Sequence, residues 1–233
     1  MKVVIACAKS KACNAGYMKT EDGRCVKFVG DPDLAKAVSP KPGFCYARPD
    51  GEAKDGKTWR EELVAYNKSC KDENPHELLQ AYKLYKNPVY RELVDSFCLK
   101  NVYILSASWG LIRASFLTPN YDITFNKNIE PFHQRNYKCD YYRDLNHLES
   151  AIDEKLLFFG GQGYLPLFCK LTRHYQGRRI CYYNSKKTPN RDGVDMVRYR
   201  TSKRTNWHYE CATKVIECYE ADPCGFDPLL ISG

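Results

Sequence analysis

One acidic residue stands in an unusual setting in this chain. The stretch FLTPNYDITF, residues 116–125, places Asp122 directly after Tyr121, with Phe116 and Phe125 at its ends. An ionised carboxylate is costly to bury without a compensating role. Beside amide groups and stacking rings, a carboxylate can stabilise the oxocarbenium-like sugar that forms as an N-glycosidic bond breaks, or activate a water. The alternative is that Asp122 only caps a turn.

Other catalytic and metal-binding patterns are missing from the sequence. No Ser-His-Asp or Cys-His order is evident, and no acidic pair of glycosidase type stands near Asp122. The twelve cysteines include no C-x-x-C pair, and several lie inside apolar runs, as buried thiols do. We therefore expect no metal site, no disulfide framework and no cofactor.

Four short apolar runs are predicted to be buried strands, and polar or aromatic residues follow each of them. These runs are residues 2–7, 101–107, 156–161 and 178–185. In open α/β sheets, ligands bind beyond the carboxyl ends of the strands. The candidates for binding a base or sugar there, besides Tyr121 and Asp122 as catalytic residues, are Asn14, Ser106, Trp109, Gln162 and Tyr164.

Two further segments suggest contacts with a nucleic acid. In FFGGQGYLPLF, backbone N–H groups at Gly161 and Gly163 could bind an anion, although a plain strand-to-helix turn explains the glycines equally. The stretch SKRTNWHYE, 202–210, adds Asn206, Trp207 and His208 as candidates for reading or stacking a base; the alternative for Asn206 is a helix cap. The predicted phosphate contacts also include Lys9, Ser10, Lys11, Lys186, Lys203 and Arg204.

The positive charge of the chain is concentrated in one segment. The formal net charge is +8, and residues 170–204 hold eleven Lys and Arg against two acids, a local excess of nine that leaves the remainder at minus one. Such a segment on an otherwise neutral protein favours a polyanionic partner, DNA being the first candidate. A solvated basic face is the alternative.

The order of the elements predicts the fold class. Strands separated by helices indicate a single α/β domain over residues 1–233, with a mixed, largely parallel sheet flanked by helices. The predicted helices begin near Thr58, Asn74 and Asn87 and occupy 163–175 and 208–219, while 196–200 is a possible edge strand. Residues 19–57 are rich in Gly, Pro, Asp and Lys, which predicts an irregular surface excursion.

Nothing in the sequence predicts a membrane protein. No apolar run approaches the roughly 18 residues of a membrane span. The start, MKVVIACAKSK, has six apolar residues between Lys2 and Lys9, which is too short for the core of a signal peptide. We expect a cytoplasmic protein without a membrane partner.

Two motifs resemble the YaaA-like group of bacterial proteins. Residues VVIACAKSK near the N-terminus and YILSASWGLI…LTPNYDITF a hundred residues on are similar to two motifs of that family. These are a Cys-Ser/Gly-Lys-Ser/Thr-Lys start, matched at Cys7, Lys9, Ser10 and Lys11, and a later I-L-S-A-x-x-G-L…P-Y-D block. The stretches YARPDG, FFGGQGYLPLF and RTNWHYECA look like a narrower subgroup and extend the resemblance over nearly the whole chain. The resemblance implies a DNA-binding α/β fold with a positively charged cleft, and an activity like that of bacterial glycosylases that excise modified bases, such as glucosylated hydroxymethylcytosine, from phage DNA.

Three hypotheses follow. The first is a DNA glycosylase acting on a modified base as anti-phage defence, with Asp122 as the catalytic carboxylate. The second is a DNA-binding or damage-response protein without catalysis. The third is a small-molecule enzyme, such as a nucleotide N-glycosidase or transferase, which needs only one phosphate pocket.

Overall fold

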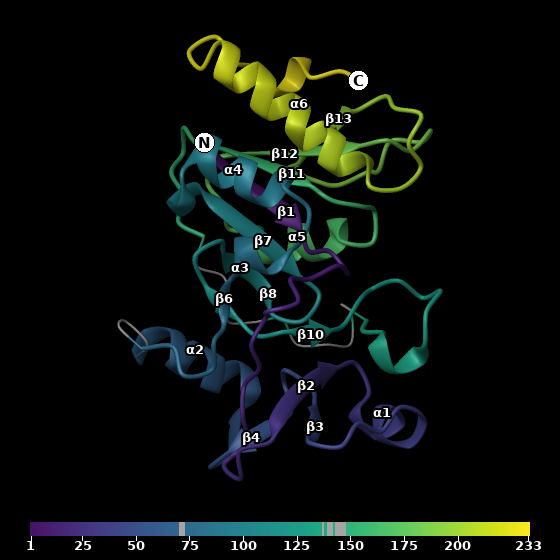
Figure 1. Ribbon diagram of the computed structural model, residues 1–233. Helices are drawn as coiled ribbons and strands as arrows, with labels where there is room; N and C mark the ends of the chain where they lie inside the picture. Colours follow the sequence, from purple (N-terminus) through teal and green to yellow (C-terminus); the bar gives the residue numbers. More distant parts are fainter. Residues whose placement is uncertain (70–72, 137, 139–141, 143–147) are drawn as a thin grey trace.

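A six-stranded, mostly parallel sheet forms the centre of the fold (Figure 1). The structure is a computed structural model and describes residues 1–69, 73–136, 138, 142 and 148–233. Within this sheet β8 runs antiparallel to β7, and the other neighbouring strands run parallel to one another. In spatial order the strands are β13 (Asp195–Arg198), β12 (Arg178–Tyr183), β11 (Lys155–Phe159), β1 (Lys2–Ala6), β7 (Val102–Ser106) and β8 (Gly110–Arg113).

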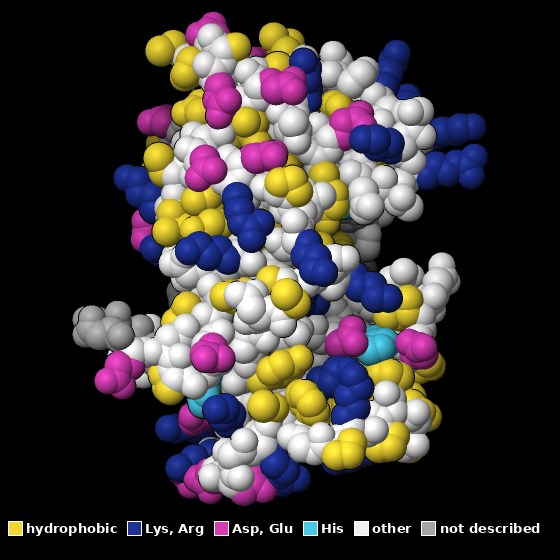
Figure 2. All heavy atoms as spheres, in the orientation of Figure 1, with side chains coloured by type: hydrophobic (Ala, Val, Ile, Leu, Met, Phe, Trp, Pro, Cys, Tyr) yellow, Lys and Arg dark blue, Asp and Glu magenta, His cyan; other side chains and the backbone are white. Residues whose placement is uncertain are grey.

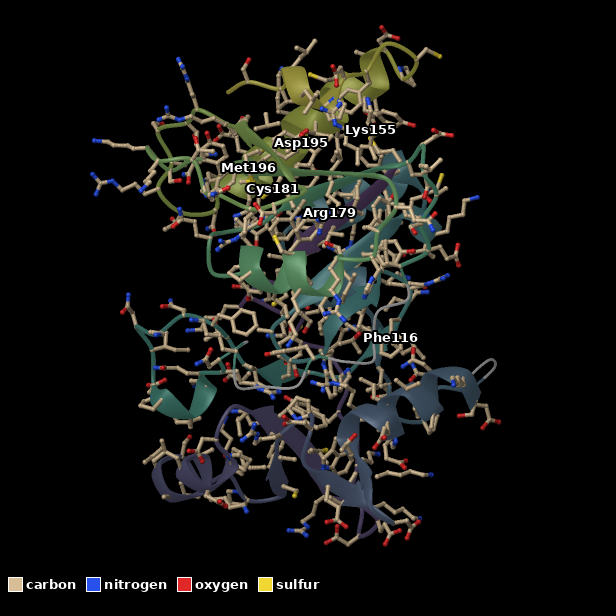
Figure 3. All side chains as sticks on the ribbon, turned by 180° about the vertical axis from the view of Figure 1, so that it is seen from behind. Phe116, Lys155, Arg179, Cys181, Asp195 and Met196 are labelled. Carbon is tan, nitrogen blue, oxygen red and sulfur yellow. The ribbon has the colours of Figure 1, made fainter. Side chains whose placement is uncertain are left out.

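Helices cover both faces of this sheet. Helices α4 (Val89–Phe97) and α6 (Trp207–Ala221) pack on one face, and α5 (Leu165–Leu171) packs on the other. Successive residues of a strand point to opposite faces, and all five residues of β1 are buried between these two layers. In the view from behind, Cys181 and Met196 lie on the face that α5 covers (Figure 3). The predicted single α/β domain with a largely parallel sheet is confirmed, as is the edge strand at β13.

Residues 19–57 contain regular secondary structure, so the predicted irregular excursion is wrong. The elements are β2 (Cys25–Val29), α1 (Pro32–Val38), β3 (Phe44–Ala47), β4 (Glu52–Lys54) and the start of β5 (Lys57–Thr58). Strands β2 and β3 form a separate parallel sheet with β10 (Tyr121–Asp122), which lies below the large sheet in Figure 1. Because β10 comes from more than 90 residues further along the chain, local composition does not reveal this pairing.

The helices after residue 58 are partly as predicted. The Thr58–Glu61 capping box opens α2 (Trp59–Ser69): the Glu61 N–H donates to Thr58 Oγ1 (3.2 Å) and Glu61 Oε2 accepts from the Thr58 N–H (2.8 Å). The helix predicted from Asn74 is wrong. Asn74 Oδ1 instead accepts from the Leu78 N–H (3.0 Å) and closes a turn. The chain continues through β6 (Leu79–Gln80), paired with β9 (Leu117–Thr118), into the short α3 (Ala81–Leu84).

Strand β1 lies where the strand order reverses. The chain leaves β1 toward β7 on one side and later fills β11, β12 and β13 on the other. Ligands of open α/β folds bind at the carboxyl end of the sheet at such a point. Short 3₁₀ helices complete the fold at η1 (Leu99–Asn101), η2 (Pro131–His133) and η3 (Pro228–Leu230). In the part of the chain that the structure describes, no helix is long and apolar enough to span a bilayer.

Candidate active site

Three adjoining cavities lie beyond the carboxyl end of β1, and Lys9 lines all three. The first, which we call the Asp122 cavity, has a volume of about 250 Å³ and is lined by Lys9, Lys11, Tyr17, Lys27, Asn120, Tyr121 and Asp122. The second, the α6 cavity, has a volume of about 340 Å³ and includes the residues before α5 and at the start of α6. A smaller cavity of about 100 Å³ shares Cys7, Lys9, Lys11, Asp122 and Tyr164 with them. Figure 2 shows Lys and Arg side chains at the waist of the molecule, between the two sheets.

Asp122 lies beside basic groups, and of the expected rings Tyr121 shares its cavity, whereas Phe116 and Phe125 do not. Its side chain is 38% exposed, and Oδ2 lies 3.3 Å from His133 Nδ1 and 3.9 Å from Lys27 Nζ. Phe116 belongs to the buried core, and Phe125 packs edge-on against Tyr164 (ring centroids 5.0 Å apart) in the α6 cavity. The carboxylate is therefore open to a ligand while lying among cations.

Tyr121 forms a fixed floor below this carboxylate. Its hydroxyl accepts a hydrogen bond from Ser106 Oγ (3.1 Å) and lies 2.8 Å from the Tyr85 hydroxyl, in the core. Burial raises the pKa of Tyr121 well above its ordinary value, so the phenol stays protonated. Tyr121 was predicted to be catalytic, but its hydroxyl is used in the core. Its ring lines the cavity, and the hydrogen bonds of its hydroxyl hold that ring in place.

Ser106 supports the floor from behind and does not reach a ligand. It is fully buried, and its Oγ accepts from the N–H groups of Ser108 and Trp109 (both 3.1 Å). Its position at the end of β7 was expected, but contact with a substrate is ruled out by its burial.

Lys11 enters the Asp122 cavity across the Tyr121 ring. Its Nζ lies 4.1 Å from the ring centroid and donates to the Lys9 carbonyl oxygen (3.4 Å). Burial lowers the pKa of Lys11, while Cys7 and Asp122 act in the opposite direction. Lys9 is exposed at the rim, where it can meet a phosphate; Ser10 and Asn14 are exposed on the same loop and lie outside the residues that line the cavities.

The glycine-rich turn before α5 lines the α6 cavity. Gly161, Gly163 and Tyr164 belong to its wall, whereas Gln162 is exposed and is not among the lining residues. The Tyr164 hydroxyl lies 3.2 Å from Cys7 Sγ, and burial raises the pKa of Tyr164 well above its ordinary value. Tyr164 therefore presents a neutral ring at the border of the α6 cavity and the small cavity.

The start of α6 contributes Asn206 and His208 to the opposite wall. Asn206 occupies the N-cap position of α6 with a left-handed backbone (φ 58°), and its carbonyl oxygen accepts from the Tyr209 N–H (3.1 Å), but its side chain makes no capping hydrogen bond. His208 packs against Tyr209 (ring centroids 4.1 Å apart), and burial lowers its pKa to about 4, which leaves a neutral imidazole at pH 7. Both side chains remain candidates for contact with a base.

Two tryptophans predicted to stack on a base are core residues. Trp109 is fully buried and packs edge-on against Phe28 (ring centroids 4.8 Å apart), while Trp207 is 6% exposed and stacks on Tyr199. Both sit in apolar packing between elements, so neither ring face is free for a ligand. Their assignment to the base pocket is corrected accordingly.

The basic segment 170–204 lies outside the three cavities. Lys186, Lys203 and Arg204 are exposed. Some of its charge is neutralised locally: Lys203 Nζ lies 2.8 Å from Glu210 Oε2, and Arg178 Nε lies 2.6 Å from Asp195 Oδ2. The segment can offer an outer surface for phosphates, separate from the lysines around Asp122.

Sequence reasoning missed several residues of the Asp122 cavity. Lys27 comes from β2, in the segment predicted to be an irregular excursion, and Tyr17 comes from the loop before β2, for which the sequence predicted no role. His133 is fixed on η2, where the Thr124 N–H donates to its carbonyl oxygen (2.9 Å), and its Nε2 lies 3.3 Å from Glu130 Oε2. A lone histidine eleven residues after Asp122 gives no sequence signal of this kind.

Comparison with known proteins adds no family assignment: no protein-family model matches the chain, and no curated protein matches it. Among the described residues, no group of three or more His, Cys, Asp or Glu side chains is placed to hold a metal ion. The ten described cysteines are free thiols. The chemistry of the cavities is therefore that of lysines, a carboxylate, an imidazole and aromatic rings.

Proposed function

We propose that this protein is a DNA glycosylase that removes a modified base, with phage DNA carrying modified cytosine as its substrate. The observation that carries the proposal is the Asp122 carboxylate, which is partly exposed in a cavity lined by Lys9, Lys11 and Lys27. A polyanion is attracted to the lysines, and a sugar that develops positive charge is stabilised by the carboxylate. The resemblance of the two motifs to YaaA-like proteins supports the same reading.

In this mechanism the target nucleotide leaves the duplex before reaction. Its sugar lies over Asp122, and the C1′–N bond breaks with its electron pair staying on the base. Asp122 stabilises the resulting oxocarbenium-like sugar, a water then adds to C1′, and the proton that this water loses neutralises the departing base. His133 and Lys27 hold the carboxylate in position, while the flanking lysines bind the phosphates on either side.

The α6 cavity is the proposed site for the departing base. It adjoins the Asp122 cavity, and its volume of about 340 Å³ lies within the roughly 300–1,000 Å³ of small-molecule sites. Phe125 and Tyr164 offer rings, and Asn206 offers an amide for hydrogen bonds. Because His208 is neutral at pH 7, its imidazole can donate or accept a hydrogen bond without adding charge.

The test is incubation with duplex and single-stranded oligonucleotides that carry cytosine, hydroxymethylcytosine or glucosylated hydroxymethylcytosine. We expect free modified base by mass spectrometry and abasic sites by alkaline cleavage. Asp122→Asn should lower the rate by roughly 100-fold or more, since it removes the charge that stabilises the sugar. Asp33→Asn is the matched control, because Asp33 is an exposed acid on α1, outside the residues that line the cavities.

Two results would overturn the proposal. Unchanged DNA together with tight, salt-dependent binding would indicate a DNA-binding protein without catalysis. Release of base from free nucleotides, with no competition by DNA, would indicate a small-molecule N-glycosidase or transferase.

A further inference from the structure

We propose that Lys11 is an amine nucleophile that captures the C1′ aldehyde of an abasic deoxyribose as an imine. This inference deepens the proposed function and depends on its assignment of DNA as the substrate. It replaces the expectation that Lys11 only contacts phosphate. The protein would then hold the damaged strand after the base has gone.

The position of Lys11 meets the first requirement, which is access to the sugar. Lys11 lines both the Asp122 cavity and the small cavity, and Asp122 lines the same two. A sugar placed over the Asp122 carboxylate therefore lies in a cavity that Lys11 also lines. Lys9 lies at the exposed rim instead.

The backbone around Lys11 meets the second requirement, which is a fixed position. The Ala12 N–H donates to the Leu84 carbonyl (2.8 Å), the Lys86 N–H donates to the Ser10 carbonyl (3.2 Å), and Lys11 itself forms a bridge with Tyr85. These contacts tie the loop after β1 to the end of α3. The main chain that carries the Lys11 side chain is therefore fixed by hydrogen bonds.

The surroundings of the amine meet the third requirement, which is a usable lone pair. Nζ lies over the Tyr121 ring at 4.1 Å, and that ring is held by hydrogen bonds to Ser106 and Tyr85. Burial of the side chain disfavours the ammonium form and lowers the pKa of Lys11, while the contact with the ring fixes where the amine lies. A lysine desolvated in this way is the usual form of an imine-forming nucleophile.

The step balances without any further reagent. The Nζ lone pair forms a bond to C1′ of the ring-opened sugar, and the carbonyl π electrons move to oxygen, giving a carbinolamine. A proton passes from the nitrogen to that oxygen, and loss of the oxygen as water, with one further proton taken from the medium, leaves a protonated imine. Addition of water reverses both steps and frees the enzyme.

The experiment uses DNA that is already abasic, so it does not depend on base removal by this protein. A duplex whose single uracil has been excised by an unrelated glycosylase is mixed with the full chain and sodium borohydride. We expect a covalent adduct on a denaturing gel, and peptide mass spectrometry should place it on Lys11. Lys11→Arg, which keeps the charge, should reduce the adduct at least 10-fold, whereas Lys36→Arg on α1 should not.

The outcomes separate the two proposals. An adduct that maps to another lysine, an equal yield from Lys11→Arg, or no adduct at all would overturn the role of Lys11. Mapping on the unaltered chain keeps the result decisive even if the variant fails to fold. The glycosylase proposal fails on different grounds, namely absence of base release from modified DNA or normal release by Asp122→Asn.

Discussion

At the scale of single residues, Lys11 should reduce the stability of the fold. Its pKa in the folded protein lies below the ordinary 10.5, so the folded state binds fewer protons than the unfolded chain between those two values. The cost is therefore full below the lowered pKa and disappears above 10.5. We expect Lys11→Met to raise the free energy of unfolding at pH 7, and to raise it less at pH 10, in urea denaturation. A less stable variant at pH 7 would contradict this account.

His208 should make the fold sensitive to acid. Its pKa is about 4 in the folded protein against an ordinary 6.5, because burial disfavours the imidazolium. The unfolded chain thus takes up a proton at this residue first, and stability is lost as the pH falls from 6.5 toward 4. Urea denaturation at pH 7 and pH 5 should show a smaller loss for His208→Gln than for the unaltered chain. Exposed His174→Gln serves as control and should leave the loss unchanged.

At the scale of elements, the start of α2 depends on its capping box. Thr58 and Glu61 satisfy each other's N–H groups at the helix N-terminus. Thr58→Ala removes the Oγ1 acceptor, and we expect the free energy of unfolding to fall by about 1 kcal/mol. Thermal unfolding measures this, with exposed Ser202→Ala as the matched change. Equal midpoints for the two variants would mean that the box adds nothing.

Strand β2 links the core to the Asp122 carboxylate. Phe28 is fully buried between Trp59 and Trp109, and it is the register partner of Tyr121 in β10. Phe28→Ala should cost about 3–5 kcal/mol and loosen the strand that presents Asp122. We expect it to lower the rate of base release more than Phe97→Ala, which removes a similar buried ring from α4. If the two variants lost equal stability and equal rates of base release, β2 would have no particular role in positioning Asp122.

At the scale of the whole molecule, the sequence predicts what depends on local pattern. The buried strands of the large sheet are continuous apolar runs, and the strand-end rule brought Lys9, Lys11 and Asp122 to one place. The small sheet was missed, because β10 has two residues and its partner strand lies in polar chain more than 90 residues earlier. The assignment of Trp109 to the base pocket failed for the same reason, since the Phe28 ring that packs against it belongs to β2.

The same long-range pairing hid two of the basic groups beside Asp122. Lys27 and His133 reach Asp122 only after β2 and η2 have docked beside β10. Residue type alone could not distinguish these two side chains from the other lysines and histidines of the chain. Conversely, Phe116 joined the buried core, because burial of apolar rings is strongly favourable, whereas Tyr121 lines the Asp122 cavity and Phe125 the α6 cavity.

The uneven charge of the molecule should govern how it holds DNA. The exposed residues Lys186, Lys203 and Arg204 lie outside the cavities, so reversing them to Glu should weaken binding without altering the chemical step. Each lost phosphate contact lowers the slope of log affinity against log salt by about 1, so the triple variant should lose about 2–3 in slope between 50 and 200 mM salt, as roughly set by counterion release. Fluorescence anisotropy measures the slope, and single-turnover base release at saturating protein should match the unaltered chain.

The control is a triple variant with Glu in place of Lys36, Lys100 and Lys214, which are exposed lysines outside the basic segment. It has the same net charge as the first triple variant, and it should keep most of the salt slope of the unaltered chain. If both triple variants behaved alike, overall charge and not the basic segment would be what draws DNA to this protein.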